Sequence, residues 1–313
     1  MAHCCLPEAI ENLSAFFSQI KWRYLEDPAG SSAEKTQLWP GDPTEEIVVC
    51  VAKGIDAQEL FHRQDYFFLN YAYRGDYDAI SHKYDNRITI REGECYISQP
   101  YAGYAIMGDS AEEIIVGVLV QKETFFKTFL PVLSADAKLF RFFLEPQTNA
   151  CADEFIHLRF ADGFSVRTLL EMMMVEYANK REDTQAVLRP LALALFMQVA
   201  RQYRLSSPAP KNETPAAKIV RYMSEHTDAV TLKTISAQFS YHPNYVSALL
   251  HRELGKTFSE ILLEQRMERA AALLKGTTLT VEEIALMLGY SNSSNFYKAF
   301  REFYHASPRE YKR

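Results

Sequence analysis

The spacing of apolar residues changes twice along the chain. Over 7–26 they recur every three or four positions, which predicts an amphipathic helix. Between Glu46 and Val120 the pattern becomes a series of short runs rich in Val, Ile and Tyr, bounded by turn residues, as strands are. Helical spacing returns after Lys122 and continues to the C-terminus. The pattern therefore predicts an α+β protein.

Short apolar runs define the predicted β-rich part. They lie at 46–52, 66–73, 77–84, 87–90, 95–98 and 113–120. Gly75-Asp76 lies between two of these runs, so we expect a tight hairpin turn there. Six or more short strands at this spacing favour a small sandwich or barrel. The preceding stretch, 27–43, is rich in Pro, Gly, Ser and Ala and is predicted to be loop.

Four further helices are predicted after the strands, at 124–133, 137–143, 163–179 and 187–204. The last two are long enough to pair as antiparallel helices. Each of these two helices has an apolar stripe, which favours packing in the core; the alternative is a dimer face. The stripes consist of Leu169, Leu170, Met173, Met174 and Tyr177, and of Leu188, Leu191, Leu195, Val199 and Tyr203. Three prolines with serines and charges over 206–215 predict a linker.

The C-terminal third contains a repeated pair of short helices. After an opening helix at 216–225, Thr231 is a suitable N-cap for a helix over 232–239. A break at 240–242 leads to a second helix over 244–254, which ends at Gly255. Two short helices joined by a turn of three or four residues form a helix-turn-helix unit.

The second pair follows the same pattern. Thr280 precedes a helix over 281–288, Gly289-Tyr290 forms the turn, and a helix over 293–303 follows. We expect this last helix to bury Phe296, Phe300 and Phe303, and we expect Ala237 and Ala285 to lie where the paired helices approach closely. A helix over 257–275 connects the pairs and would be roughly 28 Å long. Such a rod can hold two recognition helices near the ~34 Å of one turn of B-DNA.

Charge is divided unevenly between the two ends of the chain. Residues 211–313 carry a net charge of +3, and the remainder carries −9. An acidic body with a mildly basic end suits a protein that contacts DNA at one end only. The composition, 48% hydrophobic and 24% charged, is ordinary for a globular protein. The five scattered cysteines favour a reducing compartment, and we expect no signal peptide and a cytoplasmic location.

The C-terminal third resembles the DNA-binding domain of the AraC/XylS family of bacterial transcription regulators. In the second unit the resemblance rests on Ile284-Ala285, Leu288-Gly289-Tyr290, Phe296, Phe300, Phe303, Ser307-Pro308 and Tyr311. In the first unit and connecting helix it rests on Ile235, Ala237, Val246, Leu250, Gly255, Phe258, Arg266, Ala270, Leu273 and Leu274. The resemblance covers about 100 residues and implies double-stranded DNA and RNA polymerase as partners.

Specific DNA contacts are implied by position within that resemblance. The base-reading positions fall on Asn244, Ser247, Ala248 and His251, and on Ser293, Ser294, Tyr297 and Lys298. Phosphate contacts are expected from Arg252, Lys256, Arg301, Arg309 and Lys312. The Ala248 side chain cannot hydrogen-bond a base, so we expect the first unit to recognise bases through fewer hydrogen bonds.

The N-terminal part resembles the cupin-like β-barrel that this family uses to bind an effector and to dimerise. His62-x-Gln64 and Phe68 occupy the places of a metal-binding cupin's His-x-His and Glu, and Tyr104 occupies the place of a later His. With three of four ligands replaced, we expect no metal and no cofactor. The candidate effector-binding residues are His62, Tyr66, Phe68, Tyr71, Tyr73, Arg74, His82, Tyr84 and Tyr104, of which alternation places about half inside.

These observations predict an effector-binding and dimerisation domain over 1–206, with a barrel at about 44–122 and helices at about 123–205. A linker over 207–214 and a DNA-binding domain over 215–313 complete the chain. The expected function is a non-enzymatic, homodimeric activator that responds to a small molecule such as a sugar. One alternative is an effector-independent regulator whose barrel only dimerises. The other is a cupin enzyme with a DNA-binding tail, which the missing ligands disfavour.

Overall fold

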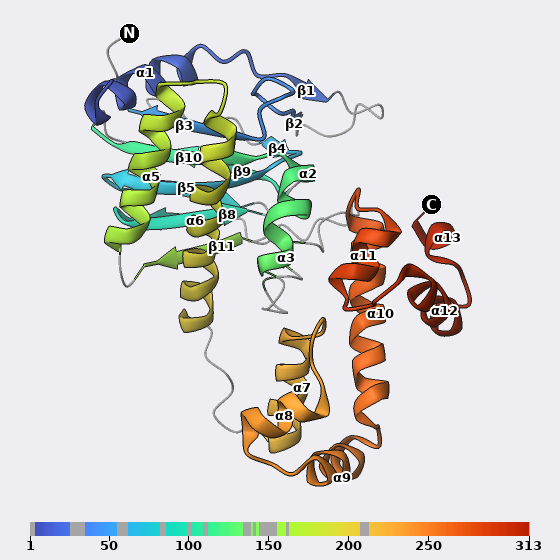
Figure 1. The fold of residues 1–313 in the computed structure, drawn as a ribbon. Coiled ribbons are helices and arrows are strands. Elements are labelled where there is room, and N and C mark those ends of the chain that lie inside the picture. Colours follow the sequence, from blue (N-terminus) through green and yellow to red (C-terminus); the bar gives the residue numbers. More distant parts are fainter. Residues whose placement is uncertain are drawn as a thin grey trace. The chain divides into compact units, whose positions relative to one another are not determined.

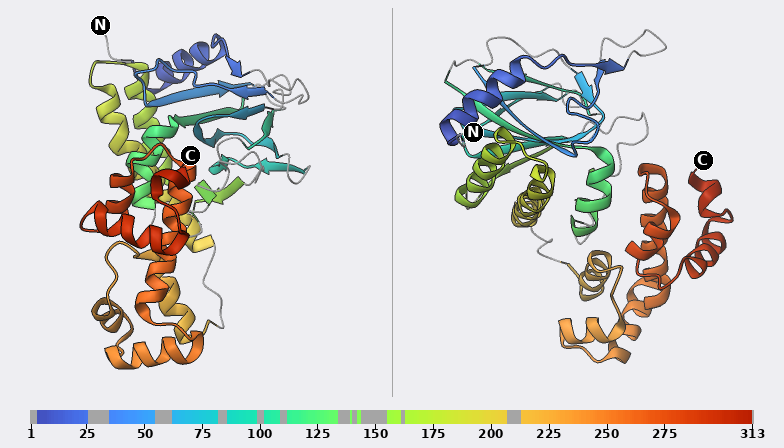
Figure 2. Two further views of the ribbon diagram at one scale, coloured as in Figure 1. Left: turned by 90° about the vertical axis from the view of Figure 1, so that its right-hand side faces the viewer. Right: turned by 45° about the horizontal axis from the view of Figure 1, so that its top comes forward.

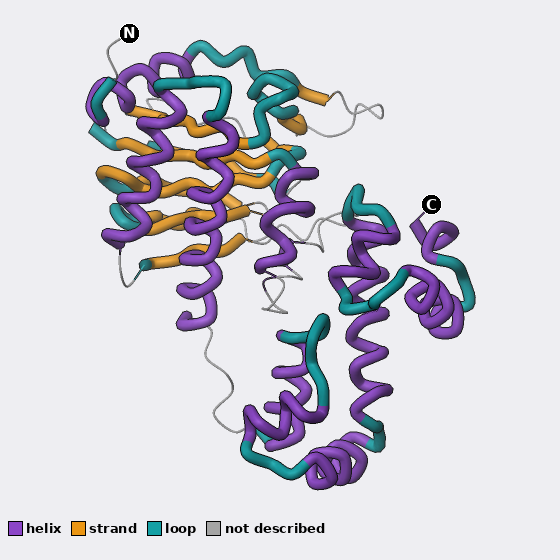
Figure 3. Tube along the Cα trace, in the orientation of Figure 1, coloured by secondary structure: helices purple, strands orange, loops and turns teal. Residues whose placement is uncertain are grey.

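The computed structural model describes residues 4–25, 35–54, 62–81, 86–98, 102–108, 112–133, 139, 142–143, 155–160, 163–206 and 213–312. The chain forms two compact units. The N-terminal unit comprises 1–129 and 146–206, and the C-terminal unit comprises 130–145 and 207–313. Helices and strands both occur in the N-terminal unit, whereas 213–312 is helical throughout apart from turns (Figures 1 and 3). The chain is therefore α+β, as predicted.

Eleven strands occur in the described residues. They are β1 Tyr24–Leu25, β2 Lys35–Gln37, β3 Ile47–Lys53, β4 His62–Gln64, β5 Phe67–Arg74, β6 Tyr77–Ser81, β7 Asn86–Ile90, β8 Glu94–Ser98, β9 Tyr104–Met107, β10 Ile114–Val120 and β11 Phe155–Arg159.

The helices begin with α1 Leu6–Ser18, α2 Lys122–Thr124, a π-helical turn η1 Phe125–Phe129, α3 Leu130–Leu133, α5 Gly163–Ala178 and α6 Thr184–Ser206. The C-terminal unit then adds α7 Pro215–Glu225, α8 Leu232–Phe239, α9 Pro243–Leu254, α10 Phe258–Gly276, α11 Val281–Met287, α12 Ser293–Tyr304 and α13 Pro308–Lys312.

The strands form two sheets. One has the order β1-β2-β4-β9-β6-β7 and the other the order β11-β8-β5-β10-β3. All pairings are antiparallel except that of β2 with β4. Rings from the two sheets meet, since the centroids of Phe68 in β5 and Tyr104 in β9 lie 4.6 Å apart. No strand pairing between described residues closes the sheets into a barrel.

The other face of the five-stranded sheet is covered by helices. Figures 1 and 2 show α5 and α6 running side by side across it. Phe67 of β5 stacks on Phe125 of η1, with ring centroids 3.7 Å apart, and the Phe125 ring in turn contacts Phe196 of α6 at 5.4 Å. The predicted pairing of the two long helices is confirmed. Seven of the ten residues of the predicted stripes are buried, but Leu169, Leu191 and Tyr203 are only half-buried.

Several predictions for the N-terminal unit are wrong. The first helix ends at Ser18 rather than continuing to 26, so Ile20 and Tyr24 lie outside it. The segment 27–43 is not all loop, because it contains β2. Gly75-Asp76 forms a tight turn, with Gly75 at φ +67°, but not a hairpin: β5 and β6 belong to different sheets. The predicted helix at 137–143 lies largely outside the described residues.

Candidate nucleic-acid interface

Each helix of the second helix-turn-helix unit has a defined beginning. The Thr280 hydroxyl accepts a hydrogen bond from the Glu283 amide, and the Glu283 carboxylate accepts one from the Thr280 amide, which forms a capping box. Gly289 takes a left-handed φ of +78° in the turn. The Asn292 side chain then caps α12 by accepting from the Asn295 amide. These local signals fix the angle at which α12 leaves the turn.

The apolar side of α12 anchors it to the domain. Phe296 and Phe300 are fully buried, and the Phe300 ring packs against Tyr304 and Tyr311. Phe303 was predicted to be buried as well, but it is 37% exposed. It lies in the last turn of the helix, where fewer neighbours cover the side chain.

The first unit repeats this construction with different residues. Thr231 and Thr234 form a capping box at α8, and Ser240 takes the left-handed conformation that Gly289 has in the second unit. α9 ends at Gly255, at φ +68° as predicted. The first unit has its own buried core, made of Ala216, Ile219, Met223, Val230, Ile235, Val246, Leu249, Leu250 and Ile261.

The close approach predicted at Ala237 is wrong for the first unit, because Ala237 is exposed. Its neighbour Ser236 has a buried hydroxyl oxygen and is the small residue on the inner side of α8. In the second unit the prediction is confirmed, since Ala285 is buried.

The base-reading residues predicted on α9 occupy one face. Asn244, Ser247, Ala248 and His251 are all exposed, at spacings that place them on one stripe opposite the buried Val246, Leu249 and Leu250. This face of α9 is therefore open to a partner along about two turns.

The corresponding face of α12 has a similar stripe. Ser294 and Lys298 are exposed, and Ser293 and Tyr297 are half-buried. Arg301 lies one further turn along the stripe, three residues after Lys298, and is exposed. Arg301 was predicted to contact phosphate, and its place on the helix puts it on the same stripe as Lys298.

The predicted phosphate-binding cations differ in what surrounds them. Arg252 lies 3.4 Å from Glu253, and Lys256 lies 2.7 Å from Glu264. The Lys312 ammonium donates to the Leu279 carbonyl at 2.5 Å. By contrast, Lys298, Arg301 and Arg309 form no ion pair with another described residue. Exposed ion pairs stabilise by only about 0–1 kcal/mol, so Arg252 and Lys256 can leave the carboxylates of Glu253 and Glu264 and bind phosphate instead.

A polar junction on α10, which the sequence pattern does not predict, joins the two helix-turn-helix units. The Arg266 guanidinium donates from Nε to the Thr227 carbonyl at 2.8 Å and from Nη2 to the Asp228 carbonyl at 3.3 Å. Its centre also lies 5.2 Å from the Tyr290 ring. Thr227 and Asp228 belong to the loop between α7 and α8, whereas Tyr290 belongs to the turn of the second unit. Arg266 therefore contacts both units at once.

Arg269 supports the same loop from one turn further along α10. Its Nη1 donates to the Thr227 hydroxyl at 2.5 Å, and burial lowers the pKa of the guanidinium to about 10. The side chain is therefore still charged at neutral pH. Gly289 packs so closely on the loop that an added Cβ would lie 1.9 Å from the Asp228 carbonyl oxygen. No repeating pattern marks such contacts, because they run from side chains to backbone carbonyls.

The residues predicted to bind an effector do not form one site. His62, Phe68 and Tyr104 lie together between the sheets: the His62 and Tyr104 ring centroids are 5.1 Å apart. Sequence reasoning missed Asn70, whose amide donates to the Tyr104 hydroxyl at 3.5 Å. Tyr66 is buried, and its hydroxyl donates to Gln37. Gln64, 1% exposed on β4, has an amide nitrogen with no hydrogen-bond partner among the described residues.

The remaining predicted effector residues lie elsewhere. The Tyr73 hydroxyl donates to Glu171 of α5 at 2.8 Å, so this ring points toward the helices, and Tyr71 lies two positions before it on the same face of β5. Arg74 is exposed. His82 and Tyr84 lie outside the described residues. Within the described ranges, no group of three or more His, Cys, Asp or Glu side chains is arranged to hold a metal ion.

Comparisons with known proteins place the C-terminal region in a family. Residues 235–313 match the model of a helix-turn-helix domain. The chain is 37% identical over 152 residues to the uncharacterized HTH-type transcriptional regulator YijO of Escherichia coli K12, covering 48% of this chain and 52% of YijO. It is 26% identical over 98 residues to the melibiose operon regulatory protein of the same organism, covering 31% of this chain and 32% of that protein.

A solved structure matches the same region. The C-terminal domain of AraT, a response regulator from Geobacillus stearothermophilus, is 31% identical, with a TM-score of 0.31, over 33% of this chain and 87% of that one. The chain thus spans about half the length of YijO and about a third of the melibiose regulator. Residues 235–313 thus match an AraC-type helix-turn-helix domain. In the part of the chain that the structure describes, no helix has the length and apolar character needed to traverse a bilayer.

Proposed function

We propose that this protein is a sequence-specific, DNA-binding transcription regulator. One observation carries the proposal: two helices, α9 and α12, each present an exposed polar stripe opposite a buried apolar one, and both belong to units anchored on α10. An exposed helix face of small polar and basic side chains suits the major groove of DNA, which admits one α-helix.

The chemistry of the two stripes assigns their roles. On α12, Lys298 can bond guanine, and Ser293, Ser294 and Tyr297 can contact neighbouring base edges. On α9, Asn244 suits adenine, and Ala248 offers only a methyl group for thymine. Phosphate contacts by Arg252, Lys256, Arg301, Arg309 and Lys312 then fix register and affinity. The second unit carries more cations without an ion pair, so we expect it to contribute more of the affinity.

The length of α10 supports binding to successive segments of the major groove. Its 19 residues span roughly 28 Å at 1.5 Å per residue, close to the ~34 Å of one turn of B-DNA. Figure 1 shows α9 and α12 near opposite ends of this helix. The proposed operator therefore consists of two subsites on one face of the duplex.

The N-terminal unit is proposed to be the cupin-like sensor. A sugar or another small polar ligand would bind between the sheets, against Phe68, Tyr104 and His62. The Gln64 amide, which has no partner in the part of the chain that the structure describes, would supply a donor. Such a ligand regulates only if it favours one arrangement of the protein over another. An activator of this kind would also contact RNA polymerase.

A homodimer is proposed through α5 and α6. Their outer faces expose Met172, Val187 and Met197, at 53%, 38% and 43%. A groove of about 390 Å³ runs between the helices and includes Met172, Val175 and Leu191 in its lining. An exposed apolar groove of this kind suits a second copy of the same helix pair.

Selection from a random duplex library tests the DNA-binding proposal. The full chain is used to enrich sequences, and the enriched duplex is then titrated by fluorescence anisotropy. Tyr297→Ala combined with Lys298→Ala should weaken binding about 30-fold or more, because two base contacts worth about 1–3 kcal/mol each are lost. Lys218→Ala on α7, the matched loss of an exposed cation, should change it far less. Full binding by the double variant would refute the assignment of α12.

A further inference from the structure

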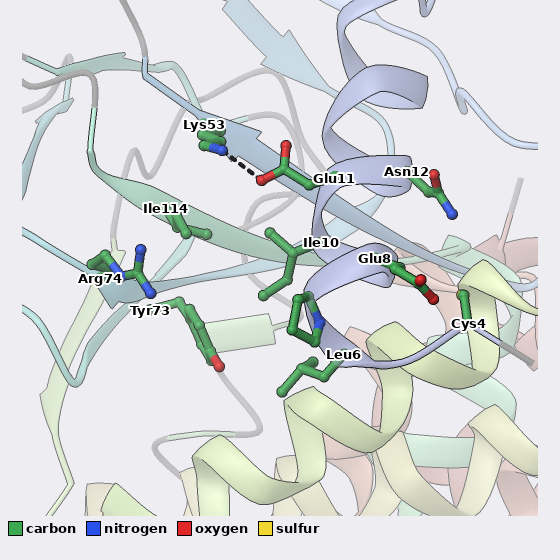
Figure 4. A pocket seen from close by; sticks show the side chains of 11 residues that line it. Cys4, Leu6, Glu8, Ile10, Glu11, Asn12, Lys53, Tyr73, Arg74 and Ile114 are labelled. Atoms are coloured by element: carbon green, nitrogen blue, oxygen red, sulfur yellow. Dashed lines mark hydrogen bonds and ion pairs between the residues drawn. The ribbon is translucent and has the colours of Figure 1, made fainter.

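One cavity of the N-terminal unit lies outside the space between the sheets. It has a volume of about 710 Å³ and lies between α1 and the ends of β3, β5 and β10. Figure 4 shows Ile10 and Leu6 of α1 on one side and Arg74, Tyr73 and Ile114 of the strands on the other. The cavity is contained in the N-terminal unit and is distinct from the cluster around Tyr104.

Part of the wall of this cavity is apolar and well packed. Ile10, Tyr73 and Ile114 are 8%, 4% and 3% exposed, so their positions are set by packing on all other sides. Leu6 is half-buried at the start of α1. A ligand of this cavity therefore needs an apolar body that can displace water from these side chains.

The charged groups of the lining leave one cation available. Lys53 is held by Glu11, with Nζ and Oε1 2.6 Å apart. The Glu8 carboxylate accepts a hydrogen bond from the Cys5 amide at 2.9 Å, as part of the cap of α1. Arg74 forms no ion pair with any other described residue, and Figure 4 shows its guanidinium on the side of the cavity that faces α1. A planar guanidinium binds a carboxylate through two parallel hydrogen bonds.

We propose that this cavity is a ligand site for a small monocarboxylate with an apolar body. The carboxylate binds Arg74, and the body packs against Ile10, Ile114 and the Tyr73 ring. The lining favours a ligand with a single negative charge, because the Lys53 charge is already balanced by Glu11. A second anionic group would face Glu8 and Glu11 without a cation of its own.

The site is linked to the helix pair by Tyr73. This residue lines the cavity, and its hydroxyl donates to Glu171 of α5 at 2.8 Å. Arg167 of α5 lies over the Tyr73 ring at 4.0 Å and donates to the Tyr73 carbonyl at 3.1 Å. Glu171 in turn lines the groove between α5 and α6. A ligand that moves the Tyr73 ring therefore moves a residue of the proposed dimer face.

Binding is tested on the full chain by calorimetry with four probes: isovalerate, phenylacetate, 3-phenylpropionate and octanoate. Each acid is paired with its neutral amide. We expect at least one acid to bind about 10-fold or more tightly than its amide, because a charge-assisted hydrogen bond is lost in the amide. Arg74→Gln should abolish that preference, and Arg91→Gln, which removes an exposed arginine outside the cavity, should retain it. No binding of any acid at 10 mM, or equal binding by Arg74→Gln, would overturn the site.

The link to the helix pair rests on the proposed regulatory function and has its own readout. The bound acid should change the dimerisation constant at least about 3-fold by sedimentation, and Tyr73→Phe should keep the binding but lose that change. Binding of the acid with no change in dimerisation would overturn the link and leave the site. Failure of the chain to select any DNA would refute the proposed function, while neither the calorimetry nor the sedimentation depends on DNA.

Discussion

Gly289 offers a sharp test of how the two helix-turn-helix units are held together. An alanine Cβ at this position would lie 1.9 Å from the Asp228 carbonyl oxygen and 2.8 Å from Nη2 of Arg266. Real Cβ contacts are essentially never below 3.0 Å, so the loop that contains Asp228 must withdraw by more than about 1 Å. This movement would stretch the hydrogen bonds from Arg266 to Thr227 and Asp228.

The expected cost has two parts. A non-glycine residue at φ +78° loses about 1–2 kcal/mol through the contact of Cβ with its own backbone. Weakening two hydrogen bonds from a charged donor costs about 1.5–3 kcal/mol more. Gly289→Ala should therefore destabilise the C-terminal unit by about 2.5–5 kcal/mol, a large part of the stability of an ordinary domain.

Gly255→Ala is the matched control. Gly255 has a similar φ of +68°, but a Cβ there would meet nothing within 4 Å. It should cost only the conformational part, about 1–2 kcal/mol. The difference between the two variants thus isolates the contact between the second unit and the loop of the first.

Hydrogen exchange of amides in α8 and α11 is the suitable assay, because it reports the opening free energy of a chosen segment. Tryptophan fluorescence would not report on this unit, since both tryptophans, Trp22 and Trp39, lie in the N-terminal unit. Equal losses of protection in the two variants would refute the account of the junction.

Four further predictions follow from other parts of the structure. Phe296→Ala should cost about 3–5 kcal/mol by the same exchange assay, since the ring is fully buried, and a loss below 1 kcal/mol would contradict its place in the core. Thr280→Ala should cost about 1 kcal/mol through the lost N-cap, and Thr280→Ser should recover most of it. Arg301→Ala should reduce the salt dependence of DNA binding by about 0.9 in the slope of log K against log salt; an unchanged slope would remove Arg301 from the phosphate contacts. Burial opposes ionisation of Glu94, but hydrogen bonds from the Arg91 amide and His157 outweigh it and lower the pKa of the carboxyl. This stabilisation is present above the unfolded pKa and lost as pH falls through the folded one, so Glu94→Gln should flatten the acid limb of the stability curve.

The C-terminal unit could be predicted closely from the sequence because its helix ends are marked locally. Threonine caps at Thr231 and Thr280 and the glycines Gly255 and Gly289 define where helices start and stop. The predicted bounds agree with the observed ones to within one or two residues. The residues of the stripes on α9 and α12 were implied by the family resemblance, and helical spacing agrees with the exposed face that they share.

The N-terminal unit was less predictable for physical reasons. β1, β2 and β4 have only two or three residues each, too few to show alternation. Residues Ile20 and Tyr24 continue a helical spacing by coincidence after α1 has ended at Ser18. Which strands pair is decided by contacts distant in sequence, so the turn at Gly75 could not reveal that it joins two sheets.

The candidate sites, too, were predictable only where they depend on local sequence. Exposed residues of a helix can be assigned from spacing, but the Arg266 junction depends on backbone carbonyls of a loop 39 positions away. Likewise, Tyr73 and Arg74 were grouped with Phe68 and Tyr104 as effector residues, although β5 directs them to different places. Alternation predicts that half of such a set lies inside, but not which cavity the other half lines.

The spacing of two DNA subsites tests the central claim most directly. Once the selected duplex has been footprinted with the full chain, five base pairs are inserted between the two protected segments. Because α10 and the Arg266 junction hold both units rigidly, we expect affinity to fall about 100-fold, to the level of a single subsite, since half a turn places the subsites on opposite faces. Unchanged affinity, or a selected site with only one protected segment, would contradict a regulator that reads DNA with two coupled helices.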